Sequence, residues 1–223
     1  MTRIALSLLL LAASAEAGDA KKTPLVAVMY FDVQSQDPQL QLLRKGLLQM
    51  ITTDLANYPQ VRVVDRDRLE EILAEQKLQS GASVDQASAV KMGKLLGASY
   101  FVSGTVLTQK EKTMFMCQVR SVETSQVLFG TKVVGDNEDV FDAEQKLVTS
   151  LIEALSKAEK FPPPDPVKHA SMKAPLKTVE KYGQALDALD KKDKATARAK
   201  LQEVVKEQPD FVLASIDLEK LMK

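Results

Sequence analysis

The chain has 223 residues, of which 45% are hydrophobic and 27% are charged, and this composition is typical of a globular protein with one good-sized domain and a smaller one. Its 30 basic and 30 acidic side chains cancel. Broad attraction to nucleic acid or to a membrane surface would need a basic excess, so the charge balance excludes both.

The N-terminus has the three parts of an export signal. Arg3 supplies a positive charge, residues 4–13 form an apolar run, and Ala15-Glu16-Ala17 is a small-residue cleavage site. The apolar run is about ten residues, whereas a membrane-spanning helix needs roughly 20. We therefore predict a signal peptide over residues 1–17, cleaved after Ala17, in preference to an ordinary first helix or strand.

Two buried strands with a helix between them open the mature chain. The nearly continuous apolar run Leu25 to Phe31 predicts a strand covered on both faces. Asp37-Pro38 supplies the N-cap and first-turn signals of a helix. Apolar residues then recur every three or four positions, at Leu40, Leu43, Leu47, Ile51 and Leu55. The strand at Val61–Val64 follows, and the unit predicts a parallel crossover.

The segment from Val61 to Gly104 predicts a strand, two helices and another strand. Asp67 with Glu70 is typical of a capping box, and Ser83 with Gln86 repeats the start signal. Gly97 is placed to end the second helix in a left-handed conformation.

Beyond Gly97 the hydrophobic period changes from 3.6 to 2, which predicts a meander of three strands between Tyr100 and Val133. A helix begins near Asn137. The predicted fold class is α/β (α+β), with a mixed five-stranded sheet in the order β-α-β-α-α-β-β-β-α and helices packed on it. We place this domain at residues 24–160.

Residues 161–175 form a proline-rich linker, because four prolines between Phe161 and Pro166 oppose helix and strand. Residues 176–223 then carry three apolar stripes at helical spacing and predict a small all-α helical-hairpin module. The order of Ala185, Ala188 and Ala197 before Pro209 resembles a tetratricopeptide repeat. Such repeats need at least three copies to stand alone, so we expect the module to pack on the first domain, on another copy or on a partner.

An apolar stripe on the first helix of this module is the candidate partner-binding surface. Its members are Val179, Tyr182, Leu186 and Leu189. They suit a groove for an apolar peptide, and the competing interpretation is packing against the neighbouring helix.

We find no catalytic, cofactor-binding or metal-binding constellation in the sequence. His169 is the only histidine, and no convergent partners are spaced near it. Cys117 is the only cysteine, so it cannot form an internal disulfide and is interpreted as a small core residue. The charges around Asp65-Arg66 are explained most simply as helix-start charges and surface ion pairs. We therefore predict a protein that is not an enzyme.

Several motifs resemble the curli-secretion CsgG family and its soluble relatives, which include flagellar outer-membrane accessory proteins. The motifs are Val63-Val64-Asp65-Arg66, Glu75-Gln76 and Gly93-Lys94-Leu95-Leu96-Gly97-Ala98, with an opening strand at Val26–Asp32 and a hairpin at Val119–Gly130. The resemblance covers residues 24–155. It implies a structural or subunit-contact role for the matching residues Asp65, Arg66, Glu75, Gln76, Gly93, Lys94 and Gly97.

The resemblance also implies work in outer-membrane secretion or surface-structure assembly. Channel-forming members are lipoproteins with long membrane hairpins, whereas this chain has no cysteine at the cleavage site and only short strand connections. We therefore expect an exported, non-lipidated periplasmic adaptor that binds protein partners of the cell envelope and has no transmembrane segment in its mature chain, with secretion as the second choice. The open alternatives are a ring-forming, homo-oligomeric secretion subunit without its own barrel, or a small-ligand-binding domain.

Overall fold

A computed structural model describes residues 23–35, 40–76, 86–163 and 173–223. Several predictions lie outside the described residues: the signal peptide with its Ala17 cleavage site, the helix start at Asp37-Pro38, the start signal at Ser83, His169 and most of the linker.

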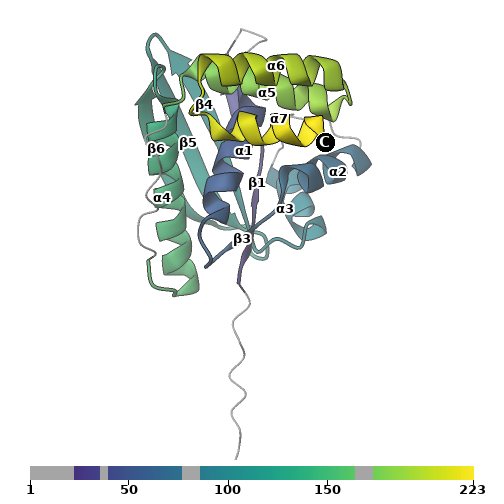
Figure 1. Cartoon of the computed structure of the whole chain (residues 1–223). Coiled ribbons are helices and arrows are strands. Elements are labelled where there is room, and N and C mark those ends of the chain that lie inside the picture. Colours follow the sequence, from purple (N-terminus) through teal and green to yellow (C-terminus); the bar gives the residue numbers. More distant parts are fainter. Residues whose placement is uncertain (1–22, 36–39, 77–85, 164–172) are drawn as a thin grey trace, which may run out of the picture.

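The described residues form a mixed sheet with helices packed on it, which confirms the predicted fold class (Figure 1). Its strands are β1 (Leu25–Val28), β2 (Asp32–Gln34), β3 (Arg62–Val63), β4 (Tyr100–Gln109), β5 (Lys112–Ser121) and β6 (Val127–Asp136). The strand order is β3-β1-β4-β5-β6. β1 is parallel to β3 and β4, as the crossover prediction requires, and β4, β5 and β6 form the antiparallel meander.

The sheet has six strands where the sequence predicted five. The apolar run from Leu25 to Phe31 does not stay in one strand, because β1 ends at Val28. The Met29 N–H still donates to the Val102 carbonyl at 2.8 Å, and the chain then resumes as β2, parallel to the distal part of β4. The extra strand therefore continues the first one along the same neighbour.

The helices are α1 (Leu43–Ala56, preceded by a 3-10 turn at Leu40–Leu42), α2 (Arg66–Glu75), α3 (Gln86–Leu95), α4 (Val140–Glu159), α5 (Leu176–Asp190), α6 (Lys194–Glu207) and α7 (Val212–Met222). α1 and α4 pack on each other, and α4 covers the β5–β6 part of the sheet. α5, α6 and α7 lie across one end of the sheet domain (Figure 1).

The start of α2 corrects the predicted capping box. The N-cap is Asp65, two residues earlier than expected, and its side chain makes no capping hydrogen bond. Asp67 lies in the first turn and pairs with Arg66, while the Glu70 carboxylate accepts a hydrogen bond from the Tyr30 hydroxyl. The two carboxylates of the predicted box thus bind side chains rather than free backbone N–H groups.

The C-terminal helices pack directly on the sheet domain through α5 and α1. Gly46 on α1 lies so close to α5 that an added Cβ would meet the Val179 carbonyl oxygen at 2.5 Å. A Cβ on Gly183 would meet the Leu42 carbonyl oxygen at 2.0 Å. Side chains of α5, α6 and α7 therefore join the sheet residues in one continuous buried core. We expected the C-terminal module to pack on the first domain, on another copy or on a partner, and in the structure it packs on the first domain. The resemblance of the module to a tetratricopeptide repeat is not confirmed.

Candidate functional site

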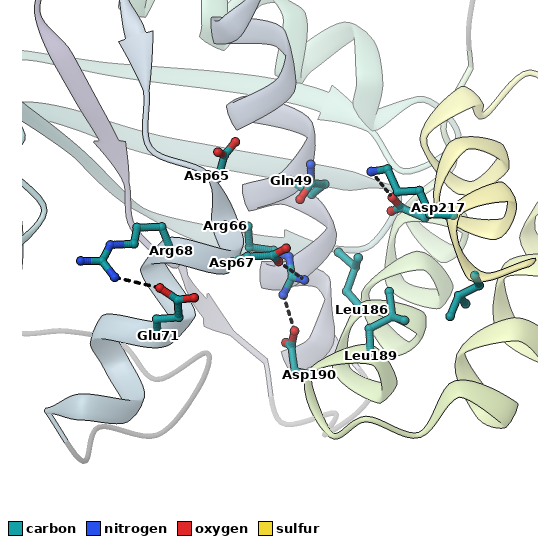
Figure 2. A pocket seen from close by; sticks show the side chains of 12 residues that line it. Gln49, Asp65, Arg66, Asp67, Arg68, Glu71, Leu186, Leu189, Asp190 and Asp217 are labelled. Atoms are coloured by element: carbon teal, nitrogen blue, oxygen red, sulfur yellow. Dashed lines mark hydrogen bonds and ion pairs between the residues drawn. The ribbon is translucent and has the colours of Figure 1, made fainter. Parts of the chain in front are cut away.

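A cleft of about 690 Å³ lies where the start of α2 meets the C-terminal helices (Figure 2). α2 contributes its N-cap and first turn, α5 its last turn, and α7 the face around Asp217. The lining residues are Gln49, Asp65, Arg66, Asp67, Arg68, Glu71, Leu186, Leu189, Asp190, Asp217, Lys220 and Leu221. This volume falls in the range of ordinary ligand pockets, roughly 300–1,000 Å³.

Buried charges join the two walls of the cleft. Arg66 is 7% exposed, and its Nη1 donates to Oδ1 of Asp190 at 2.6 Å. Lys45 of α1 is 2% exposed; its Nζ lies 2.7 Å from Oδ2 of Asp190 and 2.9 Å from Oδ1 of Asp187. Asp190 therefore receives one cation on each carboxylate oxygen. Buried cations need such partners, because removing an ion from water costs several kcal/mol.

The titration behaviour of Arg66 follows from this pairing. Burial lowers the pKa of the guanidinium, but the charge and hydrogen bond of Asp190 outweigh that effect and hold the pKa above its ordinary value. Burial raises the pKa of Asp187, and hydrogen bonds from Lys191 and Lys45 more than reverse the effect, so its pKa lies below the usual value. These groups stay charged at neutral pH and act as a clamp between the segments.

A second polar contact fixes α7 against α5. The Tyr182 ring is fully buried and meets Phe211 edge to face, with ring centroids 5.1 Å apart. Its hydroxyl donates to Oδ2 of Asp217 at 2.7 Å, and Lys220 pairs with the other oxygen of Asp217 at 3.1 Å. Burial, followed by the neighbouring Asp217 charge, raises the pKa of Tyr182 well above its usual value, so the phenol stays protonated as a donor.

The remaining cleft surface combines acidic groups with an apolar floor. The lining includes the carboxylates of Asp65, Asp67, Glu71, Asp190 and Asp217, the cations of Arg66, Arg68 and Lys220, and the leucines 186, 189 and 221. The acidic excess and the leucines suit a partner segment that carries an apolar side chain beside a basic one. Within the described ranges, histidine, cysteine, aspartate and glutamate side chains form no group of three suited to a metal ion.

The predicted partner-binding stripe is divided by the packing of α5. Val179 and Tyr182 are fully buried inside the chain's own core, and Leu186 is 2% exposed. Leu186 and the half-buried Leu189 lie along the cleft wall (Figure 2). The groove interpretation therefore has no open surface at Val179 and Tyr182 in this structure, and a partner-binding role for the cleft end of the stripe stays a prediction.

The family-motif residues occupy three separate places. Asp65 and Arg66 line the cleft, whereas Glu75 and Gln76 end α2 beyond it. Gly93 packs against Val122, where an added Cβ would lie 2.7 Å from a methyl carbon. Gly97 has φ +67°, the left-handed conformation that the sequence predicted at the end of that helix, and an exposed Lys94 lies beside it on a separate shallow cleft.

Lys45 and Asp190 were missed by sequence reasoning. Lys45 falls between Leu43 and Leu47 on a helix whose stripe reads as apolar, and Asp190 lies in a run of charges that indicates solvent. No local pattern pairs two residues so far apart in the chain. The signal that could have found them was Arg66, a cation next to a strand end in a motif otherwise made of core residues.

The structure thus defines an α+β sheet domain capped by three helices, with a polar cleft at the junction. Residues 10–118 match the family model of the curli production assembly/transport component CsgG. The predicted resemblance is thereby confirmed up to the middle of β5. No curated protein matches the chain significantly.

Several solved structures resemble part of the chain at low identity. The LpoB C-terminal domain from Escherichia coli has 15% identity and a TM-score of 0.44, with coverage of 51% of this chain and 83% of that one. Lipoprotein GNA1162 from Neisseria meningitidis has 13% identity and a TM-score of 0.45, with coverage of 60% and 98%. A PelC dodecamer from Paraburkholderia phytofirmans has 11% identity and a TM-score of 0.35, with coverage of 61% and 87%.

Proposed function

We propose that this chain is a non-enzymatic assembly or adaptor protein of the bacterial cell envelope, which works through protein–protein contacts at the cleft between α2 and the C-terminal helices. The observation that carries the proposal is the clamp of Arg66, Lys45 and Asp190, which fixes two sequence-distant segments so that their acidic rim and leucine floor form one surface. The match of residues 10–118 to the CsgG family model supports a link to secretion or to surface-structure assembly.

The composition of the cleft favours a protein segment over a reacting substrate. Its buried ionisable groups are already paired within the chain: Arg66 with Asp190, and Asp217 with Tyr182 and Lys220. Acid–base catalysis needs a group with a free proton-transfer path to a bound substrate. The exposed rim carboxylates Asp67 and Glu71 pair with Arg66 and Arg68, and ion pairs of solvent-exposed carboxylates are weak enough to exchange for a basic group of a partner.

Export to the periplasm without lipidation is part of the same proposal. It rests on the signal-peptide pattern that ends at Ala17 and on the family match. In the part of the chain that the structure describes, no helix has the length and apolar character needed to cross a membrane.

The proposal is tested by capture of envelope proteins on the purified chain and on the double variant Asp65→Lys plus Glu71→Lys. Both positions lie on the exposed rim, so the reversal changes the cleft charge without entering the core. We expect a specific partner bound by the unchanged protein and lost from this variant. The matched control is Glu153→Lys, an exposed position on α4 outside the cleft. Equal capture by all three proteins would overturn the proposal.

The small-ligand alternative is favoured by one observation, the cleft volume of about 690 Å³. It predicts saturable binding of a low-molecular-weight metabolite that stabilises the fold in thermal shift experiments. A ligand held in this cleft would also be displaced by Leu189→Arg, whereas partner capture through the acidic rim would respond to the Asp65 and Glu71 reversals.

A further inference from the structure

The outer edge of β6 is open within the described part of the chain. β6 is the last strand of the sheet order, and β5 is its neighbour among the described strands (Figure 1). At its far end, Asp136 also makes a single bridge with Asp139. The strand runs from Val127 to Asp136, which is long for an edge strand. Exposed edges of this length are templates for another strand, and proteins usually cover or break them.

Hydrogen bonds at the two ends of the β5–β6 hairpin show which β6 residues face outward. At the end near α4, the Asn137 N–H donates to the Glu111 carbonyl. At the other end, the Ser121 N–H donates to the Gln126 carbonyl, but a bulge at Leu128 shifts the register between that bond and the rest of the ladder. In an antiparallel ladder, alternate residues direct both backbone groups to the same neighbour. The register then assigns Phe129, Thr131 and Val133 to bonds with β5. Gly130, Lys132 and Val134 therefore direct their N–H and C=O groups to the open edge.

From this edge we propose that β6 pairs antiparallel with β6 of a second copy of the chain, with Thr131 at the twofold axis. Outward-facing residues must meet outward-facing residues for hydrogen bonds to form, so only every second register is available. With Thr131 opposite Thr131, Gly130 faces Lys132 of the second copy and Phe129 faces Val133. The regular part of this register runs over residues 129–133, and Leu128 at the bulge lies opposite Val134 just beyond it.

The side chains favour this register over its neighbours. A shift of two that places Lys132 opposite itself brings like charges into direct contact, which is destabilising. In the proposed register each Lys132 faces a glycine, which leaves room for its side chain. Leu128, 44% exposed, meets Val134 of the second copy, 49% exposed. Aliphatic pairs of this kind contribute about 0.2–1 kcal/mol each across strands.

The open face of the sheet continues this apolar surface. Val134 lies beside Met114 in the ladder, and Lys132 lies beside Met116, which is 37% exposed. Pairing at Thr131 would join these residues to their copies across the axis in one continuous sheet. The β6–β6 contact does not involve the α2–α5 cleft, so its test is independent of the test of the proposed function.

Cysteine cross-linking tests the register directly. Thr131→Cys is placed in a Cys117→Ala background, because Cys117 is its neighbour on β5 and would otherwise compete for the disulfide. A non-hydrogen-bonded antiparallel pair has its Cα atoms about 4.5 Å apart, within disulfide reach. We expect a covalent dimer at Thr131→Cys and none at the matched control Val133→Cys, which would lie four residues out of register from its own copy.

Light scattering on the full chain measures the oligomeric state and is the second test of the proposal. We expect a dimer that is weakened about tenfold by Val134→Lys, which places a charge on the outward face of the strand. Val134 is half exposed, so the substitution leaves the monomer core intact, and thermal unfolding serves as the check. A monomer at the highest soluble concentration, or equal cross-linking at positions 131 and 133, would overturn the proposal.

Discussion

Arg66 at the start of α2 and Asp190 at the end of α5 are 124 positions apart in sequence, and their side chains meet at 2.6 Å. Lys45 of α1 reaches the other oxygen of the same carboxylate at 2.7 Å. A carboxylate at a helix C-terminus is disfavoured by the helix dipole, and two cations offset that cost. One side chain thus links the C-terminal helices to two elements of the sheet domain.

Replacing that carboxylate should destabilise the whole protein. In Asp190→Ala, Arg66 and Lys45 remain buried with no acceptor at this position, and breaking a buried ion pair from one side costs about 3–5 kcal/mol. Denaturant unfolding measures the change. The control Asp142→Ala removes an exposed pair with Lys146 and should change stability by less than about 1 kcal/mol. Equal small effects for both variants would contradict the role of Asp190.

The close crossing of α1 and α5 predicts a strong effect of one methyl group. Gly183→Ala would place a Cβ 2.0 Å from the Leu42 carbonyl oxygen, so the two helices must separate. Overpacking of this kind costs about 1–3 kcal/mol, measured as a loss of unfolding free energy. At Gly130 the nearest atom lies 3.8 Å from an added Cβ. Gly130→Ala should therefore leave stability almost unchanged, and a similar loss at both glycines would count against tight packing.

A buried carboxyl pair between α1 and α4 should make stability depend on pH. Burial raises the pKa of Glu144 well above the ordinary value of 4.5, and the neighbouring Asp54 raises it further. Gln145 donates to both side chains. The folded protein therefore holds a proton that the unfolded chain releases above pH 4.5, so stability falls as pH rises through the folded pKa, by at most about 1.4 kcal/mol per pH unit.

The variant Glu144→Gln removes this titration while keeping the size of the side chain. Its unfolding free energy should lose that slope and exceed that of the unchanged protein at pH 7. Chemical denaturation between pH 4.5 and 8 measures both curves. Parallel curves for the two proteins would exclude a shared proton at this pair.

Removing the hydroxyl of Tyr182 should destabilise the fold less than removing the whole side chain, and the two losses can be measured separately. Tyr182→Phe removes the hydrogen bond to Asp217 but leaves the ring packed against Phe211 and Asp217 paired with Lys220. The expected loss is about 1 kcal/mol, against about 3–5 kcal/mol for Tyr182→Ala, which also removes the buried ring. Thermal unfolding of the two variants distinguishes the hydrogen bond from the packing.

Local sequence patterns were enough to predict most of the helices and strands. The apolar stripe from Leu43 to Leu55 gave α1, and the change of period after Gly97 gave the β4–β6 meander. The break between β1 and β2 was missed, because hydrophobicity continues through Phe31 while the hydrogen bonding changes. The candidate site was harder to predict from the sequence, because its central ion pair joins residues 124 positions apart. Hydrophobic periodicity reports only on contacts between residues that are close in sequence. Tyr182 was predicted as part of an apolar partner-binding stripe, but in the structure its side chain packs inside the chain.

Native-state hydrogen exchange can show whether the C-terminal helices and the sheet domain form one cooperative body with a fixed cleft between them. We expect the slowest amides of α5 to exchange with the same free energy as those of β4 and β5, because they open only on global unfolding. We also expect Asp190→Ala to lower both sets of free energies together. Exchange of α5 at a much lower free energy than β4, with β4 unaffected by Asp190→Ala, would instead show that the C-terminal helices open separately from the sheet.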